Sequence, residues 1–519
     1  MRLFDNESDS THTDGFIVKA NSDGCDHDPN VNTSTYHIII LEHGMVGNRK
    51  ELEYLKEALE HAHTRSTEKK GSVLLVHSAE CNEKDSLDGI EAGGHRFANE
   101  INDVVRRVAT GIVREHLQRQ QCSRLRPKKA IESTNITLSI IGNSLGGLFA
   151  RFAVRYIDWM VPIDLGSTSP IIEIHVIPNL FVTIATPHLG IKDMTYFKVP
   201  EFLERLAAWT FGQTGNDLFR RGNLKKKKSK IFAIKSDSEA HSKSNEVQQI
   251  KYNDIIEELC LNPEFIRPLS RFSRRIAYAN AFSSDIAVST ATGAFLADDD
   301  DDDDSYNYNN NSGTSNPQDS FSILSQGQVS MRSSHIFVPG IDVREKEISN
   351  RHIEQTRNSH NNKTQYSSAR FDTATTYCNT DREPLTRNPP TVSDMANKLD
   401  SLGWSKVFID ARPHLPAIWK RPDTQRQASQ NSFAEYIGRG GNGDLDANQI
   451  GTSCYSSGEL KRRLSGNGFD GTTLPLGHGF LVANTKDPIH KMLYTSARPF
   501  VDQIIVNGVM TELLLFVPP

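Results

Sequence analysis

Residues 136–154 read ITLSIIGNSLGGLFARFAV, and this stretch decides the fold. Its first six residues are largely apolar or β-branched, as expected for a strand buried on both faces of a parallel sheet. A glycine-rich turn follows at once, and residues 145–160 have the apolar spacing of a helix. A strand, a sharp turn with the pattern G-x-S-x-G and a helix make a nucleophile elbow, which predicts Ser144 as a catalytic nucleophile. The alternative is a glycine-rich turn with an incidental serine.

The same alternation of strand and helix extends along the chain. Apolar, β-branched runs bounded by turn residues recur, and helix-period segments lie between them, such as residues 97–117 and 247–259. This alternation predicts an α/β fold, with a mostly parallel central sheet and helices on both faces. The other predicted strands are residues 36–41, 72–77, 180–185, 274–280 and 404–410.

Composition excludes several classes of protein. The 59 Lys and Arg against 64 Asp and Glu give a net charge of −5, so no nucleic-acid partner is expected. The apolar runs are much shorter than the roughly 20 residues of a membrane-spanning helix, and the N-terminal residues lack the apolar core of a secretory signal. The six cysteines form no CxxC pair, which fits a reducing compartment and predicts a cytoplasmic protein. No nucleotide or metal motif occurs, so neither a cofactor nor a metal is expected.

Six sequence blocks are informative when they are taken together in their order along the chain: HGMVGNRKELEYLKEAL (43–59), SLDGIEAGGHRFANEI (86–101), IGNSLGGLFARFAV (141–154), FVTIATPHLGI (181–191), FGQTGNDLF (211–219) and YANAFSSDIAVSTATGAF (278–295). They resemble, in order, the serine esterase/lipase family of the α/β-hydrolases, closely over residues 35–296 and loosely over 395–420 and 472–508. One departure is Asn143, where the family usually has His before the nucleophile. The resemblance implies a lipid-ester hydrolase that is cytosolic or peripheral on membranes or lipid droplets.

The predicted domain organisation is one α/β-hydrolase core interrupted by polar insertions. Hydrophobic residues make up only 37% of the chain, which indicates that part of it does not fold. The acidic run 298–304 lacks EF-hand spacing, so only weak, nonspecific cation association is expected there. The predicted parts are a disordered tail (1–33), a core (34–296) with a cap at about 191–270, a largely disordered acidic insertion (297–392), the last strand region (393–420), a second disordered insertion (421–470) and the closing part of the core (471–519).

An oxyanion hole is expected beside the serine. The strand 36–41 ends in His43-Gly44-Met45, and in hydrolases of this type a His-Gly after an early strand supplies one backbone N–H. Gly44 and Met45 are both candidates for that donor, and the sequence leaves the choice open. The second donor is the N–H of Leu145, the residue after the nucleophile. The alternative is a plain glycine turn in which backbone groups satisfy His43.

A serine hydroxyl needs an oriented histidine base, and this fold orders its residues as Ser, acid, His. Asp285 occupies the family's acid position, and Asp410, after the last predicted strand, is its competitor. His478 has a spacing to the closing helix that resembles the family's catalytic block, although the family more often reads Ala-His than Gly-His. The other candidate bases are His490, His414 and His188, and His77 is interpreted as a satisfied turn residue.

These residues, together with the family resemblance, predict a serine hydrolase that cleaves lipid or other carboxylic esters through an acyl-enzyme. Thioesterase, amidase or acyl-transfer chemistry would use the same groups. The alternative is a catalytically silent hydrolase fold that acts as a regulatory or interaction protein. In the cap, Phe202, Leu206 and Trp209 recur at helical spacing, which fits a core-facing helix, with the lining of an acyl pocket as the alternative.

Overall fold

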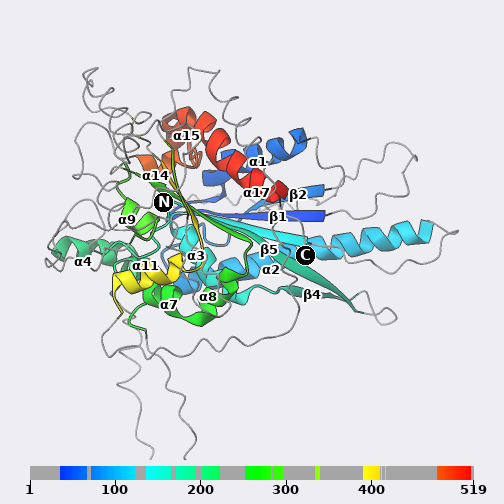
Figure 1. Ribbon diagram of the computed structural model, residues 1–519, viewed down its shortest axis with the longest axis horizontal. Helices are drawn as coiled ribbons and strands as arrows, with labels where there is room; N and C mark the ends of the chain where they lie inside the picture. Colours follow the sequence, from blue (N-terminus) through cyan, green and yellow to red (C-terminus); the bar gives the residue numbers. More distant parts are fainter. Residues whose placement is uncertain are drawn as a thin grey trace, which may run out of the picture.

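A central sheet with helices on both faces organises the molecule (Figure 1). The computed structural model describes residues 35–66, 72–122, 136–164, 171–192, 201–221, 252–281, 284–296, 334–338, 390–409, 411, 415 and 476–515. The predicted tail 1–33 and insertion 421–470 lie outside the described residues, as does most of 297–392.

The sheet has eight strands, and its path runs in the order β2-β1-β3-β5-β6-β8-β7. All pairs along this path are parallel, and β4 adds to β5 in the antiparallel direction. The predicted α/β fold with a mostly parallel sheet is therefore confirmed. The strands are β1 (Thr35–Glu42), β2 (Ser72–Ser78), β3 (Ile136–Asn143), β4 (Met160–Ile163), β5 (Ile172–Ile184), β6 (Arg274–Asn280), β7 (Ser334–Val338) and β8 (Ser405–Ile409).

Strand β1 shows why the sheet is covered on both faces. Ile38 and Ile40 pack into one apolar cluster, whereas Ile39 and Leu41 pack into another on the opposite face. Successive side chains of a strand point to opposite faces, so an unbroken apolar run needs helices on each side. All four side chains are at most 1% exposed.

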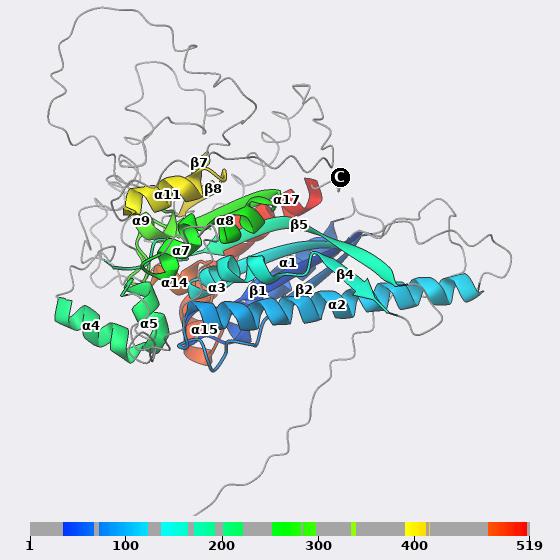
Figure 2. The ribbon, with the colours of Figure 1, turned by 90° about the horizontal axis from the view of Figure 1, so that it is seen from below.

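The helices form two layers, one on each face of the sheet (Figures 1 and 2). Figure 2 shows α2 running along the length of the sheet. One layer contains α2 (Ile90–Cys122), α3 (Leu145–Ala153), α7 (Ile255–Leu261), α8 (Pro263–Ser270) and α11 (Val392–Asp400). The other contains α1 (Glu53–Arg65), α14 (Gly477–Phe480), α15 (Pro488–Tyr494), α16 (Arg498–Phe500), the π-helical turn η6 (Val501–Val506) and α17 (Asn507–Leu515). The structure also describes three further helices, α4 (Glu201–Thr210), α5 (Gly212–Leu218) and α9 (Thr290–Gly293).

Several elements differ from the sequence prediction. The helix expected over 145–160 ends as α3 and a short 3-10 turn, η2 (Val154–Tyr156), and β4 follows. The helix expected over 247–259 begins only at Ile255, because the Asp254 side chain accepts a hydrogen bond from the Glu257 N–H and caps the helix there. An apolar island of the acidic insertion forms β7 beside β8. Helices α7 and α8, inside the predicted cap range, pack into the core.

Two properties of the described residues bear on location and ligands. None of their helices combines the length and the apolar character needed to span a membrane. Within the same ranges, no group of three or more His, Cys, Asp or Glu side chains is arranged to hold a metal ion.

Candidate active site

Ser144 lies in a strained turn between β3 and α3. Its backbone has φ 54° and ψ −125°, a conformation that L-residues rarely adopt. The glycines around it are required by close backbone approach. A Cβ on Gly142 would lie 2.5 Å from the Cα of Gly147, and a Cβ on Gly146 would lie 2.4 Å from the carbonyl oxygen of Glu42. The G-x-S-x-G spacing therefore follows from the packing of α3 against β1 and β3, and it presents the serine at the carboxyl end of the sheet.

The loop after β1 packs directly against this turn. A Cβ on Gly44 would lie 3.0 Å from the Cβ of Ser144, a tighter contact than most, so a larger residue would push the loop away from the serine. The His43 side chain is buried, and its Nδ1–H donates to the Gly44 carbonyl oxygen at 2.9 Å. The Gly44 N–H donates to Oε1 of Glu51 at 3.0 Å. His43 therefore stabilises the loop through the Gly44 carbonyl group, and the Gly44 N–H already has Glu51 as its acceptor.

The neighbouring backbone donors differ in whether they have an acceptor. The Val46 N–H donates to Oγ of Ser86 at 2.9 Å. Within the part of the chain that the structure describes, the N–H groups of Met45 and Leu145 have no hydrogen-bond acceptor. Leu145 is the first residue of α3, where backbone N–H groups lack an intrahelical partner and the helix dipole favours negative charge. Met45 and Leu145 thus present two uncommitted donors on the loop and the elbow.

Asp285 follows β6 and is completely buried. Its Oδ1 accepts hydrogen bonds from the N–H groups of Ala287 at 2.8 Å and Val288 at 3.1 Å. Its Oδ2 accepts from Asn280 Nδ2 at 3.0 Å and from His478 Nδ1 at 2.9 Å. A buried carboxylate costs several kcal/mol unless it is paired, and here four donors surround it.

The segment that carries His478 is joined to the Asp285 loop through the backbone. The Gly477 N–H donates to the Ser284 carbonyl oxygen at 2.7 Å, and Leu476 forms a β-bridge with Asp285. A Cβ at position 477 would lie 2.6 Å from that same carbonyl oxygen. The close approach explains why this chain has Gly before the histidine.

The hydrogen bond to Asp285 fixes the state of the imidazole. Because the carboxylate accepts from Nδ1, the neutral ring carries its proton there and leaves Nε2 free to accept one. Burial opposes the charged form, but the charge and hydrogen bond of Asp285, with a further contribution from the charge of Glu51, raise the pKa of His478 above its ordinary value of 6.5. The side chain remains 27% exposed, so the ring is accessible from outside.

The structure joins two of the three predicted catalytic side chains directly. Asp285 and His478 share a hydrogen bond, whereas no hydrogen bond between Ser144 and His478 occurs in the described structure. Glu51 relates the two halves of the site. Its Oε1 accepts from Asn143 Nδ2, next to the serine, at 2.6 Å, and its charge acts on His478. Apo hydrolases often form the serine–histidine bond only in the substrate complex.

His188 is a structural residue of the core. Arg151 Nη1 donates to its Nδ1 at 3.4 Å and to its carbonyl oxygen at 3.0 Å, and its Nε2 lies 2.9 Å from Thr183 Oγ1. Burial, followed by the charges of Arg151 and Lys406, lowers the pKa of His188 well below its ordinary value. A completely buried ring with both nitrogens engaged has no access to substrate.

The other competitors have local partners or fall outside the described residues. His490 Nδ1 lies 2.7 Å from the Asp487 carboxylate, which caps α15, and His77 Nε2 lies 2.7 Å from Glu100. His414 and Asp410 lie outside the described residues. Among the described histidines, only His478 contacts Asp285.

Helix α5 is connected to the same end of the sheet by side-chain hydrogen bonds. Thr214 Oγ1 donates to the Ser86 carbonyl oxygen at 2.8 Å. The hydroxyl of the same Ser86 accepts the hydrogen bond from the Val46 N–H. The Asp217 carboxylate accepts from the Ile90 N–H at 2.8 Å and so caps α2. Burial raises the pKa of Asp217 to about 6.

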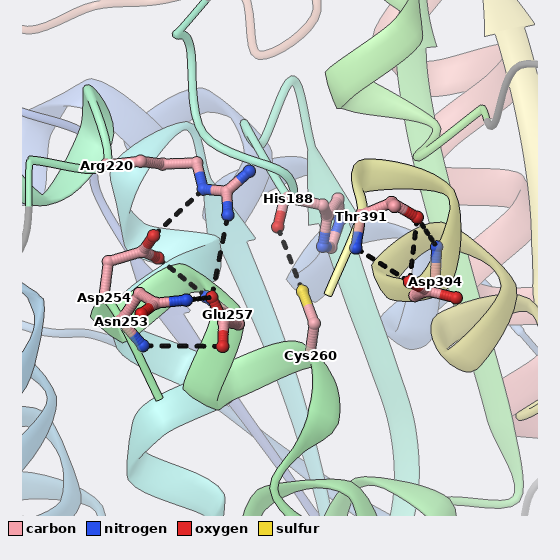
Figure 3. A network of polar contacts seen from close by, with 8 residues as sticks. All are labelled: His188, Arg220, Asn253, Asp254, Glu257, Cys260, Thr391 and Asp394. Carbon is pink, nitrogen blue, oxygen red and sulfur yellow. Dashed lines mark hydrogen bonds and ion pairs between the residues drawn. The ribbon is translucent and has the colours of Figure 1, made fainter. Parts of the chain in front are cut away.

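Arg220 then ties the end of α5 to the start of α7 (Figure 3). Its Nε lies 3.1 Å from an oxygen of Asp254, and its Nη2 lies 3.9 Å from an oxygen of Glu257. Asn253 Nδ2 donates to the same Glu257 carboxylate at 2.9 Å. The guanidinium is largely buried, which makes this a stronger anchor than a surface ion pair. Figure 3 also shows the nearby contact between Cys260 and His188.

The apolar stripe of α4 faces solvent. Phe202 is 67% exposed, Leu206 55% and Trp209 78%, so the interpretation of this stripe as core is wrong. Among the side chains of this helix that the structure describes, Ala208 is the buried one, at 1% exposed. Helical spacing shows that apolar residues share a face, but it does not show whether another element covers that face.

One residue of the site escaped the sequence prediction. Glu51 is only 4% exposed although it lies in a short 3-10 turn, η1 (Arg49–Leu52), beside charged neighbours that are exposed. In sequence it resembles any acidic residue at the start of a helix. No sequence signal distinguishes it, because its burial depends on contacts with Gly44 and Asn143 that only the fold brings about.

Comparison with known proteins identifies the family of this chain. The model of the family described as "Putative serine esterase (DUF676)" matches residues 32–295. "Putative lipase YDL109C" of Saccharomyces cerevisiae is 25% identical over 252 residues, which are 48% of this chain and 29% of that protein. "Putative lipase ROG1" of the same yeast is 28% identical over 162 residues, which are 31% of this chain and 18% of that protein. The matched region is thus less than a third of each relative's length.

A solved structure, the crystal structure of the gene lin2722 products from Listeria innocua, covers 51% of this chain and 78% of its own at 12% identity, with a TM-score of 0.23. The family model carries the identification, because it extends over more than half of the 519 residues and includes the elbow, the loop after β1 and Asp285. On that match, this chain belongs to the serine esterase family that bears the description "Putative serine esterase (DUF676)".

Proposed function

We propose that the protein is a serine hydrolase that cleaves carboxylic esters, and in particular lipid acyl esters, through a triad of Ser144, Asp285 and His478. The observation that carries this proposal is the hydrogen bond of 2.9 Å between His478 Nδ1 and the buried Asp285 carboxylate. A protein that had lost catalysis has no reason to keep a buried acid, an oriented imidazole and a strained serine turn. The silent hydrolase-fold alternative leaves all three unexplained.

In this mechanism Ser144 Oγ attacks the acyl carbonyl carbon, and its proton passes to Nε2 of His478. The imidazolium is stabilised by Asp285 and returns the proton to the leaving alkoxide, which departs as the alcohol. Water, deprotonated by the same nitrogen, then attacks the acyl-enzyme and releases the carboxylic acid. Each half-reaction passes through a tetrahedral oxyanion, which needs donors aimed at its position.

We assign the two oxyanion donors to the N–H groups of Met45 and Leu145. Leu145 follows the nucleophile and begins α3. Gly44 was the other candidate on the loop, but its N–H already donates to Glu51 at 3.0 Å. A donor engaged with a buried carboxylate has nothing left for the oxyanion, which favours Met45 as the partner of Leu145.

The acyl side of the substrate is inferred from exposed apolar residues. Phe202, Leu206 and Trp209 cover one side of α4, and Val46, on the loop beside Ser144, is 60% exposed. Large apolar side chains clustered in contact with water mark binding surfaces. An ester with a long acyl chain, presented by a lipid surface, would cover them.

The experiment is a panel of esters of one alcohol with acyl chains of increasing length. The fatty acid and the alcohol released are both measured, for the wild type and for Ser144→Ala. The proposal predicts equal release of acid and alcohol, a preference for longer chains and no turnover by Ser144→Ala. Turnover that survives in Ser144→Ala would reject the triad. A preference for acetyl over long acyl chains would reject the lipid substrate and leave the esterase chemistry standing.

A further inference from the structure

The Glu51 carboxylate connects the loop after β1 to the turn that carries Ser144. It lies in η1, directly after the loop that carries Met45, and its side chain is 4% exposed. Its Oε1 accepts from the Gly44 N–H at 3.0 Å and from Asn143 Nδ2 at 2.6 Å. One oxygen therefore joins the loop after β1 to the residue that precedes the nucleophile.

The loop is built around this carboxylate. A Cβ on Gly47 would lie 2.5 Å from Oε2 of Glu51, and a Cβ on Gly44 would lie 3.4 Å from Oε1. The missing side chain of Gly47 thus leaves room for the Glu51 carboxylate, and Gly44 lies at ordinary contact distance from it. Within the described residues Glu51 forms no ion pair, so its hydrogen bonds to the loop and the elbow hold it in the interior.

We propose that Glu51 is a positioning residue that holds the oxyanion loop against the nucleophile elbow through these two hydrogen bonds. This inference rests on the proposed esterase function. An oxyanion donor acts only within a few tenths of an ångström of its productive place. Met45 directly follows Gly44, so a shift of the Gly44 N–H moves the Met45 donor with it. Asn143 supplies the amide N–H from which this carboxylate accepts the second hydrogen bond.

Two variants of Glu51 distinguish the effect of its hydrogen bonds on kcat from the effect of its side-chain volume. Glu51→Ala removes the acceptor, whereas Glu51→Gln keeps an oxygen of the same reach and loses the charge. We expect kcat for a soluble ester to fall on the order of 10²-fold in Glu51→Ala, with KM within about threefold of wild type, and to recover at least tenfold in Glu51→Gln. The matched control is Glu57→Ala, an exposed carboxylate on the adjoining α1, for which wild-type kcat is expected.

A swap tests the contact even if Glu51→Ala fails to fold. Asn143→Asp places a second carboxylate against Glu51 at the 2.6 Å contact and breaks it. In Asn143→Asp with Glu51→Gln the donor and acceptor are exchanged and the hydrogen bond can form again. We expect the double variant to have a kcat at least about tenfold above that of Asn143→Asp alone, with thermal unfolding confirming that both are folded.

The outcomes are distinct. Equal losses of kcat in Glu51→Ala and Glu51→Gln, together with a double variant no better than Asn143→Asp, would overturn the positioning role while the wild-type esterase stands. A Glu51→Ala enzyme as active as Glu57→Ala would overturn it as well. A folded wild type that does not turn over esters, or turnover that persists in Ser144→Ala, would reject the proposed function itself, and this inference with it.

Discussion

Nδ1 of His478 donates to the buried carboxylate of Asp285 across 2.9 Å, although 193 residues of sequence separate them. The contact is made where a β-bridge between Leu476 and Asp285 brings the last part of the chain beside the loop after β6.

The first prediction concerns the pair of Asp285 and His478. Asp285→Asn should keep the fold and lower kcat on the order of 10⁴-fold, because an amide orients the imidazole in the wrong tautomer. Steady-state ester hydrolysis measures the effect, with Asp103→Asn, an exposed carboxylate of α2, as the control. A loss below tenfold would exclude Asp285 as the acid.

The pH dependence of catalysis provides a second prediction. Burial opposes protonation of His478, but Asp285 and then Glu51 raise its pKa above 6.5. The base must be neutral to accept the serine proton, so kcat/KM should fall on the acid side with a midpoint above pH 6.5. The groups that face the ring also include Lys486, whose charge opposes the shift. Removing the carboxylate in Asp285→Asn should move the midpoint to lower pH. A midpoint below 6.5 in the wild type would contradict the assignment of His478.

The same shift affects stability in the opposite direction. A histidine whose pKa is higher in the folded state stabilises the fold fully below its unfolded value near 6.5, and this contribution is lost as pH rises through the folded pKa. The contribution of His478 to the free energy of unfolding should therefore decrease over the range where activity increases. Denaturant unfolding of the wild type and His478→Ala at several pH values measures the difference. A difference that grows with pH would show that the pKa of His478 is lowered.

Gly477 offers a prediction about packing beside the histidine. A Cβ there would lie 2.6 Å from the Ser284 carbonyl oxygen. Gly477→Ala should destabilise the fold by roughly 1–3 kcal/mol and reduce kcat, because the strand bridge that positions His478 must shift. The control is Gly111→Ala in α2, where nothing lies within 4 Å of the new Cβ. That variant should stabilise the fold by about 0.5–1 kcal/mol, as expected for alanine in a helix. Equal effects of the two substitutions would refute the steric argument.

The exposed stripe of α4 makes a prediction that separates surface binding from chemistry. Phe202→Ser combined with Trp209→Ser should leave thermal stability within about 2 °C of wild type, since both side chains face solvent. Hydrolysis of a short, soluble ester should stay the same, whereas hydrolysis of long-chain esters in vesicles should fall on the order of tenfold. Glu201→Gln on the same helix is the control. Equal loss on both substrates would place the stripe in the catalytic centre rather than at a lipid surface.

Much of the fold was predictable because the central strands are buried on both faces. Runs such as Ile38–Leu41 and the glycines at 142 and 146 admit few other structures, and the position of the serine followed from them. Asp285 and His478 could be proposed only from the family resemblance, since no local pattern joins residues so far apart in sequence. The direction of the α4 stripe, the short antiparallel β4 and the burial of Glu51 depend on tertiary contacts that periodicity does not encode.

The most direct test of the account is the stoichiometry and site of labelling by a fluorophosphonate, which reacts only with an activated serine. Intact mass and peptide mapping are measured for the folded wild type, for Ser144→Ala and for Ser401→Ala, a control whose hydroxyl lies at the end of α11. We predict one label per chain on Ser144 in the wild type and in Ser401→Ala, and none in Ser144→Ala. No label on a folded wild type, or a label that persists in Ser144→Ala, would contradict Ser144 as the nucleophile.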